Sequence, residues 1–142
     1  MPRIHKNYRG FHLNIENPAG TVRKGRGWRT LMRHHYGEIS GTKGVDGDCI
    51  DIFLPAGGPI SSRIFAIHQR DPRTGIYDED KLILGAPNEN EAVDTYLEHY
   101  ADGDAFLMNV TEWTVDDLAE VLLSSKGEPG KLDKLAKIRW LK

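Results

Sequence analysis

The chain has 142 residues, a formal net charge of −2 and one cysteine. This length suits a single domain that folds without a disulfide or a structural metal. The charge is unevenly divided: residues 1–44 carry +7, residues 45–122 carry −13 and residues 123–142 carry +4. A uniformly basic nucleic-acid-binding protein is therefore disfavoured. No apolar run approaches the roughly 18 residues that a membrane helix needs, so no membrane partner is expected.

Alternating apolar residues predict the first strand, in which Phe11, Leu13 and Ile15 are followed by a turn at 17–20. The Gly- and Arg-rich stretch at 23–27 is expected to be a flexible basic loop. Further strands are predicted at 50–54, 63–69, 81–84 and 106–112, with turn residues at 71–75.

Two helices are predicted from their caps and apolar spacing. The first begins at Asn88 as N-cap with Glu91 three residues later, and the second begins at Thr114 with Asp117 in the same position. The predicted fold class is α+β, a small closed or partly open OB-like β-barrel with two or three helices packed outside. We expect one domain over 1–142, with a core at about 11–123 and a basic C-terminal tail or short helix at 124–142.

Three aspartates stand close together at a glycine turn that leads into an apolar strand: Asp46, Asp48 and Asp51. Carboxylates so close repel one another and raise each other's pKa unless cations neutralise them. Oxygen ligands of this kind suit Mg²⁺, Mn²⁺ or Ca²⁺, whereas zinc usually recruits His or Cys. The spacing excludes an EF-hand, because Asp51 stands where its glycine is required. A turn with solvated charges is the alternative.

Further charged residues favour the metal site over the solvated turn. Additional acids occur at 71–80, and a basic set precedes the three aspartates in sequence: Arg23, Lys24, Arg26, Arg29, Arg33 and Lys43. A polyphosphate bound between metal ions and fixed cations needs both kinds of side chain on facing walls. The opposed charge blocks would then be two sides of one site.

The stretch Y-G-E-I-S-G-T-K-G-V-D-G-D-C-I-D-I-F at 36–53 resembles the signature of the soluble, Mg-dependent inorganic pyrophosphatases of family I. The segments I-E-N-P-A at 15–19, D-P-R-T-G-I-Y-D-E-D-K at 71–81 and E-H-Y at 98–100 are similar to other parts of that family, in the same order. The chain is most similar to the short pyrophosphatase-like domains of bacteriophages and mobile elements. A cytoplasmic enzyme is expected, in the host cytoplasm if phage-encoded, in agreement with the lone Cys49 and the absence of a signal peptide.

The resemblance implies Mg²⁺-dependent hydrolysis of pyrophosphate, with Mn²⁺ as an alternative metal. Asp48 would also orient and deprotonate the attacking water, and Glu16 would hold an outer metal. Arg23, Arg29, Tyr36, Lys81 and Tyr100 would bind phosphate or the leaving group, with Lys81 and Tyr100 taking part in catalysis. The implied metal ligands are Asp46, Asp48, Asp51, Asp71 and Glu79, the last standing where the family has an aspartate.

Three departures from the family pattern bear on activity. Cys49 replaces a proline, Ala101 replaces a lysine that contacts the leaving group, and Met32 replaces a tyrosine. Weaker binding of the leaving phosphate would lower turnover or widen the substrate range. Two alternatives therefore stay open: a hydrolase of nucleotides or other phosphoanhydrides in phage infection, and a catalytically weak structural or nucleic-acid-binding module. Bacterial members usually form hexamers, so a homo-oligomer is a further expectation.

Overall fold

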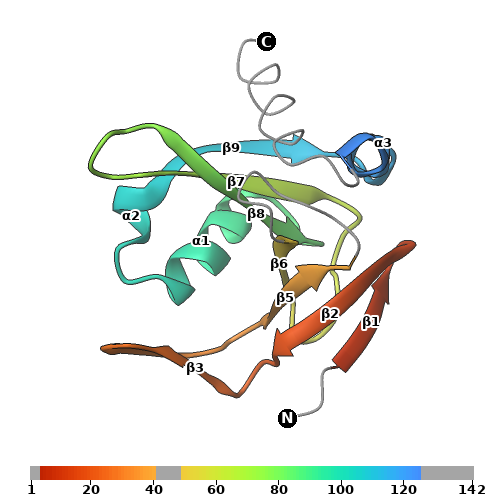
Figure 1. Cartoon of the computed structure of the whole chain (residues 1–142). Coiled ribbons are helices and arrows are strands. Elements are labelled where there is room, and N and C mark those ends of the chain that lie inside the picture. Colours follow the sequence, from red (N-terminus) through yellow and green to blue (C-terminus); the bar gives the residue numbers. More distant parts are fainter. Residues whose placement is uncertain (1–3, 41–48, 126–142) are drawn as a thin grey trace.

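The computed structural model describes residues 4–40 and 49–125. Seven strands form one mixed sheet in the order β1-β2-β5-β6-β8-β7-β9, and β3 and β4 form a separate hairpin (Figure 1). The strands are β1 (Ile4–Tyr8), β2 (Phe11–Asn17), β3 (Val22–Gly25), β4 (Trp28–Leu31), β5 (His35–Ile39), β6 (Ile50–Leu54), β7 (Ile64–Arg70), β8 (Tyr77–Leu84) and β9 (Leu107–Trp113). The helices are α1 (Glu89–His99), α2 (Gly103–Phe106) and α3 (Val115–Ser125).

The predicted α+β class with a partly open barrel is confirmed. Strands β1 and β9 end the strand order and do not pair with each other in the described part of the chain. Both predicted helices are present with their caps, because the Asn88 side chain accepts the Glu91 N–H at 2.9 Å and Thr114 Oγ1 accepts the Asp117 N–H at 3.0 Å. Among the described residues, no helix is long and apolar enough to cross a membrane.

The prediction of a flexible loop at 23–27 is wrong. Val22 pairs with Leu31 and Gly25 with Trp28, which makes 22–31 an antiparallel hairpin (Figure 1). Only two residues connect the strands, and the second of them, Gly27, has φ +80°, a conformation that glycine adopts without strain. Strand β1 and helix α2 were not predicted; β1 has four exposed residues, 4–7, so it lacks the apolar signal of a core strand.

Alternate residues of the strands enter two cores on opposite sides of the sheet. On one side, which we call the α3 side, Ile52, Leu82 and Ala66 pack with Leu118 of α3. On the other, the α1 side, a second core is formed by Met32, Tyr36, Phe53, Phe65, Ile67, Ile83, Ala86, Ala92 and Tyr96. Because side chains alternate along a strand, Asp51, Glu79 and Lys81 lie on the α1 side, whereas Asp80 lies on the α3 side.

The glycine of the Tyr36-Gly37 pair is explained by the close approach of β2 to β5. A Cβ atom at Gly37 would lie 2.1 Å from the backbone oxygen of Asn14 and 2.8 Å from the Cα of Ile15. Neither contact can be relieved by a side-chain rotation, since both atoms belong to the backbone. Gly37 therefore lets the two strands pair closely and fixes Tyr36 and Glu38 on the α1 side of the sheet.

Candidate active site

Lys81 is the centre of a polar cluster on the α1 side of the sheet. The parallel pairing of β6 and β8 places it directly beside Asp51. Its Nζ donates to Asp51 Oδ2 at 2.8 Å and to the Tyr36 hydroxyl at 2.9 Å, and lies 3.8 Å from Glu79 Oε2. The side chain of Lys81 is 6% exposed. The predicted association of Lys81, Tyr36, Asp51 and Glu79 therefore exists as one cluster of direct contacts.

The environment keeps Lys81 charged and Tyr36 neutral. Burial alone would lower the pKa of the Lys81 ammonium, but the oxygens of Tyr100, Tyr36 and Asp51 raise that pKa well above its ordinary value. Burial raises the pKa of the Tyr36 phenol, and this outweighs the opposing effect of Lys81. The site thus presents a fixed cation and a protonated phenol, both of which are hydrogen-bond donors suited to an anionic ligand.

Tyr100 adds a hydroxyl that has no hydrogen-bond partner in the described part of the chain. It is the C-cap of α1, and its ring stacks on Tyr96 with the centroids 4.9 Å apart. Lys81 Nζ lies 5.6 Å from the centre of the Tyr100 ring. The Tyr100 hydroxyl is buried and no described residue bonds to it. A buried polar group left in this state costs about 1–3 kcal/mol, so the site holds an unused hydrogen-bonding group.

The hairpin brings Arg23 to the same cluster. The Arg23 guanidinium lies 4.6 Å from the centre of the Tyr36 ring and 5.2 Å from the centre of the Trp28 indole. Arg29 is placed differently. It pairs with Lys24, the residue after Arg23, so the side chains of Arg29 and Lys24 lie on the face of the hairpin opposite to that of Arg23. Arg23 is joined to the cluster, and the role predicted for Arg29 stays a prediction.

The remaining predicted metal ligands are spread around the cluster or lie outside the described residues. Glu16 is exposed at a β-bulge in β2, between Ile15 and Asn17. Asp71 begins the β7–β8 turn, where it accepts the Arg73 N–H at 2.9 Å, and this bond together with the Arg73 guanidinium lowers the pKa of its carboxyl. The predictions for Asp46 and Asp48 fall on residues that are not described.

Sequence reasoning missed three polar residues of the α1 side. Glu38 stands opposite Asp51 in the pairing of β5 with β6, so two carboxylates face each other across neighbouring strands. Gln69 and Tyr96 are buried behind Glu79. Glu38 could have been placed near the site from the sequence, because it stands two residues after Tyr36 and alternate residues of a strand share a face.

The donor set fits part of a site for a divalent cation. In residues 4–40 and 49–125 no three His, Cys, Asp or Glu side chains are grouped closely enough to share a metal ion. The carboxylates of Asp51 and Glu79 are nevertheless 31% and 27% exposed and supply only oxygen, the ligand that Mg²⁺ and Mn²⁺ prefer. These two side chains thus suit a magnesium site that further carboxylates would complete.

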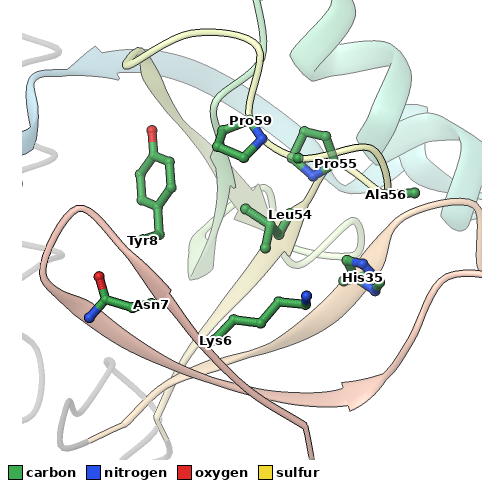
Figure 2. A pocket seen from close by; sticks show the side chains of 9 residues that line it. Lys6, Asn7, Tyr8, His35, Leu54, Pro55, Ala56 and Pro59 are labelled. Carbon is green, nitrogen blue, oxygen red and sulfur yellow. The ribbon is translucent and has the colours of Figure 1, made fainter.

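A hollow on another part of the surface has a different lining. It lies beside β1 and the segment after β6, with Lys6, Tyr8, His35, Leu54 and Pro55 around it (Figure 2). It has a single fixed cation, and none of its lining residues is acidic. His35 is occupied in positioning the backbone, because its Nδ1 accepts the Ala19 N–H at 3.0 Å. The hollow therefore lacks the paired charges of the Lys81 cluster.

A family model described as Inorganic Pyrophosphatase matches residues 3–123. No curated protein matches the chain. Among solved structures, an inorganic pyrophosphatase from Neisseria gonorrhoeae is similar, with 18% sequence identity, a TM-score of 0.46 and coverage of 80% of this chain and 87% of that one.

A buried lysine between acids, with Tyr36 and Tyr100 beside it, supplies a positive charge and hydrogen-bonding groups that suit an anionic ligand such as phosphate. The family model covers most of the chain, and the protein therefore belongs to the inorganic pyrophosphatase family. As a member of that family it is an inorganic diphosphatase, an enzyme that hydrolyses pyrophosphate.

Proposed function

We propose that the chain hydrolyses pyrophosphate to two phosphates in a Mg²⁺-dependent reaction at the Lys81 cluster. The observation that carries this proposal is the convergence of a buried, charged Lys81 with the Tyr100 hydroxyl, which no residue in 4–40 or 49–125 hydrogen-bonds. A phosphate oxygen would satisfy that hydroxyl and share the positive charge, which removes the cost of leaving the group unpaired.

The metal ligands would come from the acids of the cluster and its surroundings. When bound, Mg²⁺ supplies Lewis acidity, which polarises a phosphate and lowers the pKa of a bound water toward neutrality. Mn²⁺ is the alternative ion, because it accepts the same oxygen ligands. The residues proposed to hold the cations are Asp46, Asp48, Asp51, Asp71 and Glu79, with Glu16 holding an outer one.

The protein's own groups would bind the substrate and move one proton. Asp48 would accept the proton of the attacking water. Lys81 and Tyr100 would donate hydrogen bonds to phosphate oxygens as charge develops on the leaving group, and Tyr36 would hold Lys81 in place through their 2.9 Å hydrogen bond. Arg23, stacked on Tyr36, and Arg29 would neutralise the remaining phosphate charge.

The test is the rate of phosphate release from pyrophosphate by Asp48→Asn with Mg²⁺, Mn²⁺ or Co²⁺. Removing the general base is expected to lower the rate by about 100-fold or more. Asp94→Asn is the matched control, because Asp94 is exposed on α1, and this variant should keep the wild-type rate. Full activity in Asp48→Asn would refute the proposed role of Asp48, and an inactive wild type with all three metals would refute the proposed reaction.

A second candidate substrate, a nucleoside triphosphate, is favoured by one observation. The Trp28 indole is 46% exposed and lies against Arg23, which itself contacts Tyr36 of the cluster. An exposed indole beside a phosphate site can stack on a nucleobase, which is worth about 1–3 kcal/mol. If Trp28 stacks on a nucleobase, Trp28→Ala should lower kcat/KM for ATP about tenfold or more and leave kcat/KM for pyrophosphate unchanged. Equal losses for both substrates would reject the nucleotide reading.

We also propose that the enzyme acts in the cytoplasm, which in a phage-infected cell is that of the host, as a single domain that forms a homo-oligomer. The lone Cys49 supports a reducing compartment. Light scattering coupled to size-exclusion chromatography measures the assembly directly, and a monomeric mass at micromolar concentration would contradict the proposed oligomer.

A further inference from the structure

A chain of buried hydrogen bonds leads from the interior of α1 to Glu79. The Tyr96 hydroxyl donates to Gln69 Oε1 at 2.6 Å, and Gln69 Nε2 donates to Glu79 Oε1 at 3.0 Å. Tyr96 is 0% exposed and Gln69 is 5% exposed, so neither exchanges these bonds for water. Gln69 and Glu79 are also direct neighbours in the pairing of β7 with β8. Neither Gln69 nor Tyr96 has a role in the reaction proposed above.

The donor–acceptor direction of these hydrogen bonds is fixed by Tyr96, which is the buried end of the series. Burial raises the pKa of the Tyr96 phenol, an effect that Tyr100 adds to, so the hydroxyl stays protonated and donates. A donating phenol requires the Gln69 oxygen to face it, and the Gln69 nitrogen is thereby turned toward Glu79. The amide then offers Glu79 Oε1 a hydrogen-bond donor.

Glu79 gains its orientation from these bonds. A glutamate side chain has three rotatable bonds, and fixing a long side chain of this kind costs conformational entropy. Lys81 restrains it weakly, because Nζ lies 3.8 Å from Glu79 Oε2 while it bonds Asp51 and Tyr36 at shorter distances. The hydrogen bond from Gln69 holds Oε1, and Oε2 lies on the side of Lys81.

We propose that Gln69, backed by Tyr96, is a positioning residue that presents Glu79 as a cation ligand and so sets the affinity of the enzyme for Mg²⁺. This inference rests on the proposed function, in which Glu79 binds a metal. It adds a requirement beyond the ligands themselves: a donor–acceptor pair on β7 and α1 that orients one of them. Groups that orient a metal ligand through hydrogen bonds typically contribute 10–100-fold to metal affinity.

The test measures Mn²⁺ binding to the substrate-free protein by electron paramagnetic resonance, with Mg²⁺ competition giving the Mg²⁺ affinity. Gln69→Met keeps the size of the side chain and removes its hydrogen bonds, and it is expected to weaken binding about tenfold or more. Tyr96→Phe removes one hydroxyl and should weaken binding in the same direction by a smaller factor. At saturating Mg²⁺, kcat for pyrophosphate should stay within about twofold of wild type, because the ligands are all still present.

Two further variants separate positioning from general loss of structure. Tyr77→Phe lies on the α3 side of β8 and disturbs a buried hydrogen bond there, so it should lower stability without changing Mn²⁺ affinity. In a Glu79→Ala background, Gln69→Met should have no further effect on Mn²⁺ binding, because Gln69 acts through Glu79.

The outcomes distinguish this inference from the proposed function. A wild type that hydrolyses pyrophosphate and binds Mn²⁺, with unchanged affinity in both Gln69→Met and Tyr96→Phe, would overturn the positioning role alone. The same conclusion holds if the Gln69→Met effect persists without Glu79. A wild type that neither binds Mn²⁺ nor releases phosphate would overturn the proposed function and the inference together.

Discussion

Strand β8 carries two buried polar networks back to back, and they differ in how completely they are satisfied. On the α3 side, His68 bonds Asp80 through Nδ1 and Thr111 Oγ1 through Nε2, the latter at 2.7 Å. The other Asp80 oxygen accepts the Tyr77 hydroxyl at 2.6 Å, and Thr111 also accepts the Trp113 N–H at 2.8 Å. On the α1 side, Lys81 contacts Asp51 and Glu79, but the Tyr100 hydroxyl has no hydrogen-bond partner within 4–40 and 49–125.

The comparison separates a network that stabilises the fold from one that binds a ligand. On the α3 side both ring nitrogens of His68 and both oxygens of Asp80 are used, so a ligand would have to break existing bonds to enter. On the α1 side a ligand would gain an unused donor beside a fixed cation. Changes on the α3 side should therefore affect the free energy of unfolding, and changes on the α1 side should affect catalysis.

The largest expected effect is that of His68→Leu on stability. This change leaves the Asp80 carboxylate buried without its main partner, and breaking a buried pair in this way costs about 3–5 kcal/mol. Urea denaturation measures the loss, with exposed His12 on β2 supplying the control variant His12→Leu. Phosphate release per folded molecule should be unchanged. A fall in that rate comparable with the Asp48→Asn effect would place the network in the active site.

The next effects are expected from a Tyr-to-Phe substitution made on each side of the sheet. Tyr77→Phe removes a hydrogen bond to the buried Asp80 and should lower the free energy of unfolding by about 1–3 kcal/mol, with no change in kcat/KM. Differential scanning calorimetry and phosphate release report the two quantities. If kcat/KM falls and stability does not, the assignment of the two sides is reversed.

Tyr100→Phe should give the opposite result. The lost hydroxyl has no hydrogen-bond partner among the described residues, so stability should be unchanged or slightly higher. Loss of its bond to phosphate in the transition state should lower kcat/KM about tenfold, which corresponds to about 1.4 kcal/mol. A large loss of stability together with full activity would show that the hydroxyl serves the fold.

The smallest expected effect is a pH dependence from His99 on the α1 side. Its Nε2 accepts the Arg33 N–H at 3.0 Å and its Nδ1 donates to the Thr95 carbonyl at 2.6 Å, an arrangement that requires the neutral ring. Burial lowers the pKa of His99, and the nearby charges of His34 and Arg33 lower it further, against the opposing effects of the Thr95 carbonyl and Glu98. The unfolded chain therefore takes up the proton more readily than the folded one.

This contribution to stability is present above the ordinary histidine pKa of about 6.5 and is lost as the pH falls below it. Thermal unfolding between pH 8 and pH 5 should show a smaller decrease of Tm for His99→Gln than for wild type, because the amide does not titrate. His35 has a pKa lowered by burial as well, so part of the dependence should remain. Identical curves for both proteins would exclude His99 as the titrating group.

The sequence predicted those elements whose signals are local. The caps at Asn88 and Thr114 follow from residue type. The family resemblance names Asp51 and Lys81 as site residues but gives no contact between them, and the β6–β8 pairing brings them together. The hairpin at 22–31 was missed because its strands have mostly exposed residues and no apolar alternation.

Gln69 and Tyr96 were missed for a different reason. A single polar residue in an apolar strand, and a tyrosine on the apolar face of a helix, each look like ordinary core positions. Their hydrogen bond joins residues 27 positions apart, so only the packing of α1 on β7 reveals it. His68 is likewise a buried polar residue of an apolar strand, and its partners Asp80 and Thr111 could not be named from the sequence.

The parallel pairing of β6 with β8 also has a consequence for folding kinetics. Asp51 and Lys81 are 30 residues apart in sequence, and they meet only when β8 pairs in parallel with β6. Parallel pairing between distant segments forms slowly, because chain entropy is lost before the contacts compensate for it. During refolding, helical circular dichroism should recover before phosphate release does, because the active site is complete only once β6 and β8 have paired.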